Sequence, residues 1–340
     1  MKLLRLVSCG ALWLCTGVLP VSAQSYHVAQ TYKLSGDGGW DYLALDTVGH
    51  RLFIAHQDRV IVVDPATGKQ LGEIPGLNRA HGIAFAYEAQ HGFATSGADS
   101  TVTMFDLKTL HVRRHTMVAP DDDAILYDAA TKRIFTFNGD AHSATAIDAV
   151  SGKRIGDIDL GAGPEFAVSA GDGKLYVNLE DKSAVAEIDA ASMRVTRQWS
   201  LAPCENPSGL AIDREHHRLF SGCRNQVMAI SDATAGALVT TLPIGQGVDA
   251  CRFDVGTQLA FASNGDGTLT VIHEETPTKF VVVGNTPTKR GARTMEVDPQ
   301  THRVYTVTAD FGPPPAPTPE RPRPRPSILP GTFALLVLDP

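Results

Sequence analysis

Three histidines and several acidic residues are the side chains of this sequence best suited to hold a metal ion. The histidines are His56, His81 and His142, and the aspartates that could join them are Asp41, Asp99, Asp123 and Asp140. Imidazole and carboxylate groups are common ligands of divalent cations. A calcium ion would instead suit the oxygens of Glu165, Asn206, Asp249 and Asp266. Neither set contains an HxH or HExxH pair, so scattered solvent-facing side chains are the simpler interpretation and no metal is assigned.

A second set of polar residues could orient a small ligand that carries both signs of charge. Its basic part is Arg79, His81, Arg290 and Arg293, and arginine suits a carboxylate or phosphate because its donors are planar and paired. The run Asp121-Asp122-Asp123 could hold a cationic or hydroxylated end, and Trp40 could stack on the ligand. The other binding candidates are Asp41, Glu165, Asn206, Arg224 and Asp249. The alternative is that these residues are polar because they face water, with Arg290 and Arg293 paired to Asp249 or Asp310.

No familiar catalytic motif is present. The sequence lacks GxSxG, a P-loop and a haem-attachment CxxCH, so His81 is the one weak candidate for a catalytic base. The formal charge is −7, and loss of an N-terminal segment with Lys2 and Arg5 would bring it to −9. That charge argues against general nucleic-acid binding, because nucleic acids are polyanions.

An internal repeat predicts the elements that position these residues. The segment "DYLALDTVGHRLFIAHQDRVIVVDPATGK" from Asp41 matches "SGLAIDREHHRLFSGCRNQVMAISDATAG" from Ser208. The aligned positions are Phe53, Phe93, Phe135, Tyr176, Phe220, Ala260 and Tyr305, with spacings of 40, 42, 41, 44, 40 and 45 residues. Short runs of Val, Ile, Phe, Tyr and Thr between Gly, Asp, Asn and Pro predict strands. Four short strands per repeat indicate an all-β, seven-bladed β-propeller that forms one domain over 24–340.

The repeat register places the candidate residues on one face of the ring. In a propeller, the loops that enter the inner strands and those that join the second and third strands meet on the same face. We call this the top face, and the channel opening there the top mouth. The ligand-binding candidates come from these loops, so a site at the top mouth is expected.

The last blade is incomplete in chain order. Its third strand, "TFALLVLDP", ends the sequence, while "YHVAQTYKL" from Tyr26 to Leu34 precedes the first blade. This N-terminal strand is therefore predicted to complete the last blade and close the ring, which removes two exposed sheet edges. The Pro-rich stretch 311–331, with nine of the 21 prolines, becomes a loop between the second and third strands. It is either an arm over the top face or a tolerated insertion.

The N-terminus indicates export. Residues 1–23 resemble a signal peptide, with Lys2 and Arg5 before an apolar run and Val21-Ser22-Ala23 at the cleavage site. A periplasmic or secreted protein is expected, without a transmembrane segment in the mature chain. Cys204, Cys223 and Cys251 remain after cleavage. Cys204 and Cys223 are predicted to form a disulfide with Cys251 free, and a Cys223–Cys251 pair is the alternative.

The segments "RLFIA", "KLYVN" and "RVYTV" and the "VVDPATGK" turn resemble the YVTN-repeat propellers, the YncE-like family. The resemblance spans essentially Tyr26 to Pro340. It implies an exported propeller and does not specify a function, because relatives include lactonases, lyases, haem- and copper-containing domains and binding proteins. The histidine cluster and haem ligands of the redox relatives are not evident here.

Three functions remain open. The leading hypothesis is a monomeric, non-enzymatic binding protein that holds a small polar ligand, a glycan or another protein at the top mouth. The second is a metal-assisted lactonase or lyase with His81 as base. The third is an interaction platform whose Pro-rich arm recruits a partner.

Overall fold

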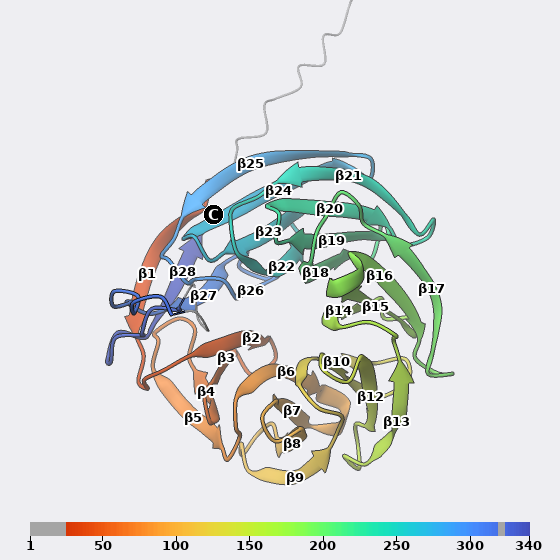
Figure 1. The fold of residues 1–340 in the computed structure, drawn as a ribbon. Coiled ribbons are helices and arrows are strands. Elements are labelled where there is room, and N and C mark those ends of the chain that lie inside the picture. The colour runs from red at the N-terminus through yellow and green to blue at the C-terminus, as the bar shows by residue number, and fades with distance from the viewer. Residues whose placement is uncertain (1–24, 319–323) are drawn as a thin grey trace, which may run out of the picture.

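The protein forms a ring of seven four-stranded antiparallel sheets, as the computed structural model shows for residues 25–318 and 324–340 (Figure 1). The predicted signal peptide and Arg321 and Arg323 of the Pro-rich stretch lie outside the described residues. Each sheet is one blade, and the prediction of a seven-bladed β-propeller is confirmed. Two 3-10 turns, Tyr87–Ala89 and Glu180–Lys182, are the helical segments among the described residues.

The four strands of each blade follow one another outward from the axis. The inner strands are β2 (Trp40–Asp46), β6 (Ala80–Ala86), β10 (Asp122–Asp128), β14 (Pro164–Ser169), β18 (Pro207–Asp213), β22 (Val248–Asp254) and β26 (Met295–Val297). The second strands are β3 (Arg51–His56), β7 (His91–Ser96), β11 (Arg133–Asn138), β15 (Lys174–Leu179), β19 (Arg218–Cys223), β23 (Leu259–Asn264) and β27 (Val304–Thr308).

The outer half of each blade is built in the same way. The third strands are β4 (Arg59–Val63), β8 (Thr101–Asp106), β12 (Ser143–Asp148), β16 (Ala184–Asp189), β20 (Val227–Asp232), β24 (Thr268–Thr276) and β28 (Ala334–Asp339). The outermost strands are β5 (Gln70–Pro75), β9 (Val112–Met117), β13 (Arg154–Asp159), β17 (Arg194–Ser200), β21 (Ala237–Pro243), β25 (Lys279–Pro287) and β1 (His27–Lys33).

The ring closes through the N-terminal strand, as predicted. β1 pairs antiparallel with β28, with Thr31 opposite Leu336 and Lys33 opposite Ala334. Tyr26 adds a side-chain contact, because its hydroxyl donates a hydrogen bond of 2.9 Å to the carbonyl of His302. The outer position of the seventh blade is therefore filled from the opposite end of the chain (Figure 1).

The hydrophobic core lies between the blades. Buried residues of the described chain fall into seven clusters, one at each interface between neighbouring blades. The repeat positions in the second strands are each at most 4% exposed, and they are Phe53, Phe93, Phe135, Tyr176, Phe220, Ala260 and Tyr305. One blade cannot bury both of its faces alone, so the ring is the stable unit.

The Pro-rich stretch joins β27 to β28. Phe311 pairs with Ile328 in an isolated β-bridge, and the amide of Gly312 donates a 2.8 Å hydrogen bond to the carbonyl of Ser327. The ring of Phe311 packs 6.2 Å from that of Trp40. The two ends of the loop are thus held together at the top face. Separately, the described residues contain no helix with the length and apolarity needed to cross a bilayer.

Candidate functional site

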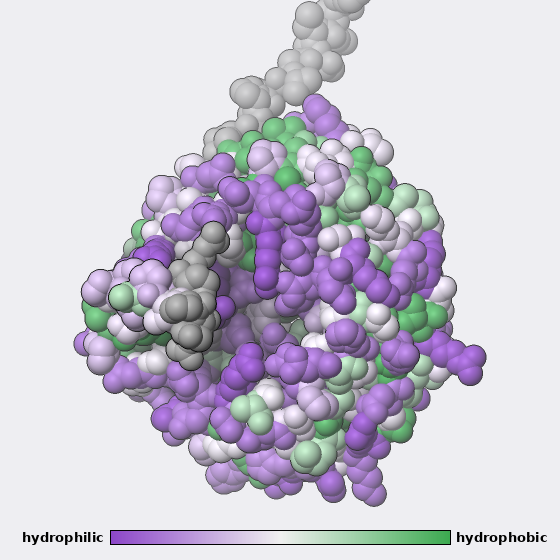
Figure 2. Space-filling model, viewed as in Figure 1, coloured by the Kyte–Doolittle hydropathy of each residue, from purple (hydrophilic) through white to green (hydrophobic). Residues whose placement is uncertain are grey.

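One position repeats at the start of the inner strands and brings seven side chains around the axis. In six blades the pairing between inner and second strand shifts at this point, as in a β-bulge, which re-aims side chains. The register of β26 assigns the seventh position. These residues, here named the ring of seven, are Asp41, His81, Asp123, Glu165, Ser208, Asp249 and Arg293. Figure 2 shows a hollow at the centre of the ring with hydrophilic side chains around it.

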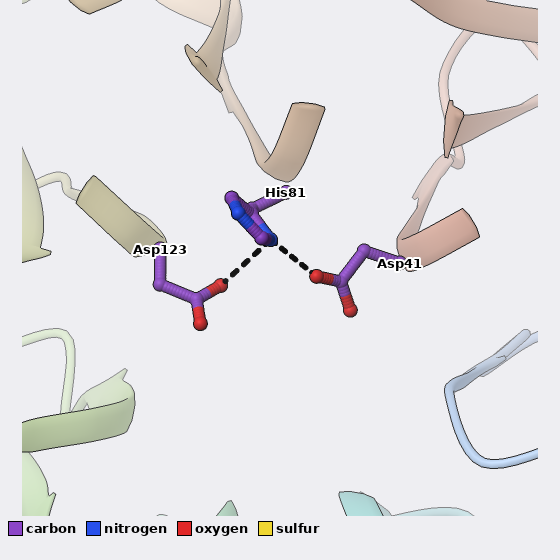
Figure 3. A group of neighbouring side chains, drawn as sticks. All are labelled: Asp41, His81 and Asp123. Atoms are coloured by element: carbon purple, nitrogen blue, oxygen red, sulfur yellow. Dashed lines mark hydrogen bonds and ion pairs between the residues drawn. The ribbon is translucent and has the colours of Figure 1, made fainter. Parts of the chain in front are cut away.

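Asp41, His81 and Asp123, here named the top cluster, converge from three adjacent blades. Nδ1 of His81 bonds to Oδ2 of Asp41 and lies 3.4 Å from Oδ1 of Asp123. One ligand atom from each residue lies within 4.8 Å of the other two. Figure 3 shows the imidazole between the two carboxylates, with its Nδ1 edge toward both.

The protein holds the His81 ring firmly. Its side chain is 8% exposed, and a Cβ atom on Gly97 would lie 2.9 Å from Nε2, so glycine leaves room for the ring. Burial disfavours the imidazolium, but the hydrogen bond to Asp41 and the negative charges of Asp123 and Asp41 outweigh it and raise the pKa of His81. When no metal ion is bound, the imidazole of His81 therefore favours its protonated form. A protonated imidazole is a poor general base.

Arg293 is occupied by ion pairs rather than free for an anionic ligand. Its Nη1 pairs with Asp249 and lies 3.5 Å from Oδ1 of Asp41, while Nη2 donates a 3.2 Å hydrogen bond to the carbonyl of Trp40. Burial opposes its charge, but Asp249 and Asp41 raise the pKa of Arg293. This arrangement matches the alternative in which Arg293 pairs with Asp249.

The remaining acids of the mouth are crowded and partly buried. Burial, reinforced by the charge of Asp41, raises the pKa of Asp123 to about 7. Burial and a hydrogen bond with Glu180 raise the pKa of Glu165 to about 10. Burial also raises the pKa of Asp249, although Arg293 opposes the shift. A mouth of this kind favours the uptake of protons or other cations.

Several predicted site residues lie away from the axis. Trp40 is buried, with its ring 5.6 Å from that of Phe333, so it is not free to stack on a ligand. Asp122 is fully buried and accepts a 3.1 Å hydrogen bond from the amide of Ser96, and burial raises its pKa to about 7. The guanidinium of Arg290 lies 5.5 Å from the ring of Phe311.

Three further candidates line the rim of the top face. Arg79 lies 3.4 Å from Asp121, and Arg224 pairs with Glu180 at 2.8 Å. The backbone amide of Asn206 donates a 3.3 Å hydrogen bond to the hydroxyl of Ser183. These residues surround the ring of seven without belonging to it.

The other proposed metal ligands do not join the top cluster. His56 is buried against the ring of Phe333 at 4.7 Å, and burial lowers its pKa. His142 lies in the turn between β11 and β12, with its amide bonded to the carbonyl of Gly139. Asp266 of the calcium set accepts hydrogen bonds from Gln246 and Thr268, which fix the loops around it.

Tyr42 and Phe166, which sequence reasoning missed, lie one residue further along their strands. Their rings are 4.9 Å apart, and Tyr42 is buried. Both line a cavity of about 560 Å³ that continues along the inner strands toward the bottom face. The sequence register could have predicted both residues, because each directly follows a member of the ring of seven.

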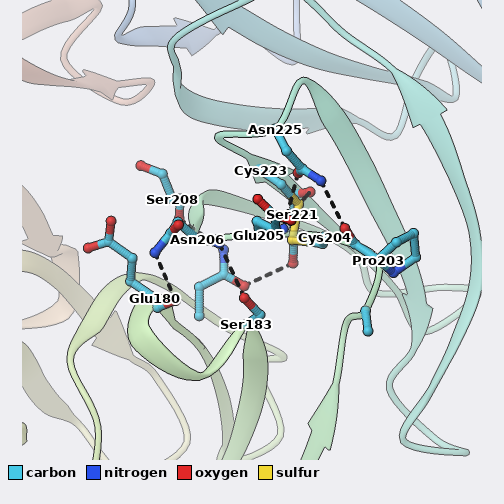
Figure 4. The surroundings of a disulfide bond; sticks show 12 residues. Glu180, Ser183, Pro203, Cys204, Glu205, Asn206, Ser208, Ser221, Cys223 and Asn225 are labelled. Atoms are coloured by element: carbon cyan, nitrogen blue, oxygen red, sulfur yellow. Dashed lines mark hydrogen bonds between the residues drawn. A yellow bond between two sulfur atoms is a disulfide. The ribbon is translucent and has the colours of Figure 1, made fainter.

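A disulfide fixes the loop that enters the fifth blade. Cys204 and Cys223 are bonded, with their Cα atoms 5.6 Å apart (Figure 4). Asn225 holds the same loop by donating a 2.8 Å hydrogen bond to the carbonyl of Pro203. Closing a loop of this length contributes roughly 3 kcal/mol by restricting the unfolded chain. Cys251 is free and buried, and burial raises the pKa of its thiol to about 12.

Comparison with known proteins identifies the fold. No protein-family model matches the chain, and no curated protein matches it in sequence. Among solved structures, the WD40 repeats of RRP9 match with a TM-score of 0.75 and 9% identity, over 93% of this chain and 99% of that one. The structure of U3-55K matches with a TM-score of 0.74 and 8% identity, over 91% and 99%.

A third structure is more distant in shape. Hydrazine synthase of Kuenenia stuttgartiensis matches with a TM-score of 0.51 and 17% identity, over 73% of this chain and 98% of that one. These likenesses establish the architecture of a seven-bladed propeller. They do not confirm the YVTN-repeat resemblance, and at these identities they carry no function.

Proposed function

We propose that this protein is an exported β-propeller that binds a cation at its top mouth, with a divalent metal ion held by Asp41, His81 and Asp123 as the simplest such ligand. The observation that carries the proposal is the composition of the ring of seven. It contains four carboxylates, and its two basic members, Arg293 and His81, are both already paired with acids. An incoming cation would relieve the repulsion among these carboxylates.

The top cluster offers ligands of the kind that divalent metals take. A metal bound to Nδ1 of His81 would take the place of the hydrogen bond between this nitrogen and Asp41. One imidazole nitrogen and two carboxylate oxygens leave further coordination positions for water or a bound ligand. Asp123 remains accessible, because its side chain is 32% exposed.

A binding role is supported better than hydrolysis with His81 as base. Its imidazole lies between two carboxylates that stabilise the protonated form. The propeller itself provides a rigid support, since the cluster sits on three inner strands rather than on mobile loops.

Isothermal titration of the metal-free protein tests this proposal. Zn²⁺, Mn²⁺ and Ca²⁺, and separately 1,4-diaminobutane, would be titrated into wild type, Asp123→Asn and Asp140→Asn. Asp140 is an exposed aspartate on the same face and serves as the control. We expect at least tenfold weaker binding of one cation in Asp123→Asn alone. Equal binding of every probe by the three proteins would place any cation site elsewhere.

Export is tested separately. Expression of the full chain in a bacterium with two membranes should yield periplasmic protein that begins near residue 24, as measured by intact mass. Cytoplasmic protein that retains residues 1–23 would contradict the export part of the proposal and leave the binding part unaffected.

A further inference from the structure

A buried carboxylate that accepts no hydrogen bond of good geometry lies on the bottom face, between the fifth and sixth blades. The side chain of Glu274, near the end of β24, is 1% exposed, and its oxygens accept no hydrogen bond of good geometry, although Nδ1 of His216 lies 3.1 Å from Oε1. Burying a carboxylate is costly unless a charge or donor compensates it. Its location is remote from the top cluster, because β24 runs from the top face to the bottom face.

The position of Glu274 is apolar in other blades. Its amide donates to the carbonyl of Gln258, the residue just before the second strand of its blade. The same hydrogen bond is made one residue past the third strand in four other blades, by Leu107, Ala149, Ala190 and Ala233. All four are buried. Packing alone therefore requires a small or apolar residue here, and the carboxylate needs another explanation.

Two side chains that can bind a metal ion face Glu274 from the neighbouring blade. Asp213 ends β18, and His216 lies in the turn that follows it. Nδ1 of His216 is 2.6 Å from Oδ2 of Asp213 and 3.1 Å from Oε1 of Glu274. These three residues are here named the bottom cluster, and one ligand atom from each lies within 4.8 Å of the other two.

The surroundings keep these ligands in place and leave them available. Oδ1 of Asp213 accepts a 2.9 Å hydrogen bond from the amide of Glu215, so its other oxygen faces the cluster. Arg218, whose charge also acts on Glu274, pairs with Asp232 at 2.9 Å and donates to the carbonyls of His216 and Pro277. The side chain of His216 is 31% exposed, which gives an ion a path from solvent.

We propose that the bottom cluster is a binding site for a divalent transition metal, with Zn²⁺ as the best-suited ion. One imidazole nitrogen and two carboxylate oxygens match the ligands of zinc, and water would complete the coordination. Zinc–ligand bonds of about 2.0 Å in a tetrahedron require ligand atoms roughly 3.3 Å apart. The two present separations from Nδ1 of His216, 2.6 Å and 3.1 Å, lie close to this value. The ion would link the fifth blade to the sixth.

Zinc uptake by the full, EDTA-treated protein tests the site, measured by competition with a chromophoric chelator and by melting temperature. Glu274→Ala introduces the residue found at this position in three other blades, and His216→Ala removes the nitrogen ligand. We expect each variant to bind one equivalent of zinc at least tenfold more weakly than wild type and to lose the zinc-dependent rise in melting temperature. His217→Ala, which changes an exposed neighbour, should behave like wild type.

The design separates this site from the top mouth and from misfolding. Asp123→Asn should still bind the zinc equivalent of the bottom cluster, whether or not the top cluster binds a cation. In metal-free buffer, Glu274→Ala should melt about as high as wild type, because the lost carboxylate accepts no hydrogen bond of good geometry and His216 keeps its pair with Asp213. If Glu274→Ala and His216→Ala take up zinc with wild-type stoichiometry and affinity, the proposal is wrong. The proposal is also wrong if wild type binds no zinc equivalent beyond those that the two variants bind.

Discussion

The carboxyl of Glu165 shows how a single residue of the mouth responds to its surroundings. It is half-buried, shares a hydrogen bond with Glu180 and has a pKa raised to about 10. A carboxyl whose pKa is higher in the folded state than in the unfolded chain binds its proton more tightly when folded. Its contribution to stability is complete below the unfolded pKa and is lost as pH rises toward the folded value.

We therefore predict that the free energy of unfolding of wild type falls between pH 5 and pH 9, and that Glu165→Gln flattens this dependence. The slope from one proton is at most about 1.4 kcal/mol per pH unit. Partial exposure to solvent makes the expected difference smaller. Urea unfolding in EDTA at each pH measures it, with Glu205→Gln, an exposed residue, as control. Parallel curves for wild type and Glu165→Gln would contradict the assignment.

At the scale of elements, β1 is the strand on which ring closure depends. Tyr26 and Leu34 at its two ends are buried, and the ring of Tyr26 packs 5.1 Å from that of Phe261 in the sixth blade. The carbonyl of Tyr26 also accepts a 3.0 Å hydrogen bond from the hydroxyl of Thr286. The strand thus joins the seventh blade to the sixth as well as completing its sheet.

Deletion of residues 26–34 is predicted to destabilise the whole ring. Losing the burial of two large apolar side chains costs about 4 kcal/mol, which corresponds to a drop of roughly 6 °C in melting temperature for a domain of this size. Differential scanning calorimetry measures it. Val28→Ala, on the exposed side of the same strand, should change the melting temperature little. An unchanged melt after the deletion would contradict closure by β1.

At the scale of the molecule, the core is shared among blades and unfolding should be cooperative. Phe135 is fully buried in the cluster between the third and fourth blades. Phe135→Ala is predicted to cost about 3–5 kcal/mol and to lower a single calorimetric transition. Ile155→Ala in the same blade, 44% exposed, should cost less than about 0.5 kcal/mol. A second, separate transition in Phe135→Ala would show that the blades unfold independently.

The two metal proposals also belong to this scale, because each cluster draws its ligands from more than one blade. The top cluster uses β2, β6 and β10, and the bottom cluster uses β24 with β18 and the turn after it. The three residues of the top cluster are about 40 residues apart along the chain, whereas in the bottom cluster Glu274 is distant from Asp213 and His216, which are neighbours in sequence. Packing of neighbouring blades brings them together.

The sequence by itself determined the fold. Strand patterns are local, and the recurrence of one position, aromatic in six of the seven repeats from Phe53 to Tyr305, indicated the number of blades. The missing strand after "TFALLVLDP" and the spare one at Tyr26 predicted closure, because an unpaired edge is unfavourable. The register also placed Asp41, His81 and Asp123 near the same mouth.

The tertiary structure alone decided which side chains meet. Arg293 and Arg290 looked equivalent in sequence, yet one pairs with Asp249 and the other lies over Phe311. Trp40 packs between the seventh and first blades, and Glu274 of the sixth blade faces Asp213 of the adjacent fifth blade. Bulges, side-chain rotamers and the packing of neighbouring blades set these contacts. They are long-range properties, and a repeat pattern specifies the backbone positions without specifying the partners.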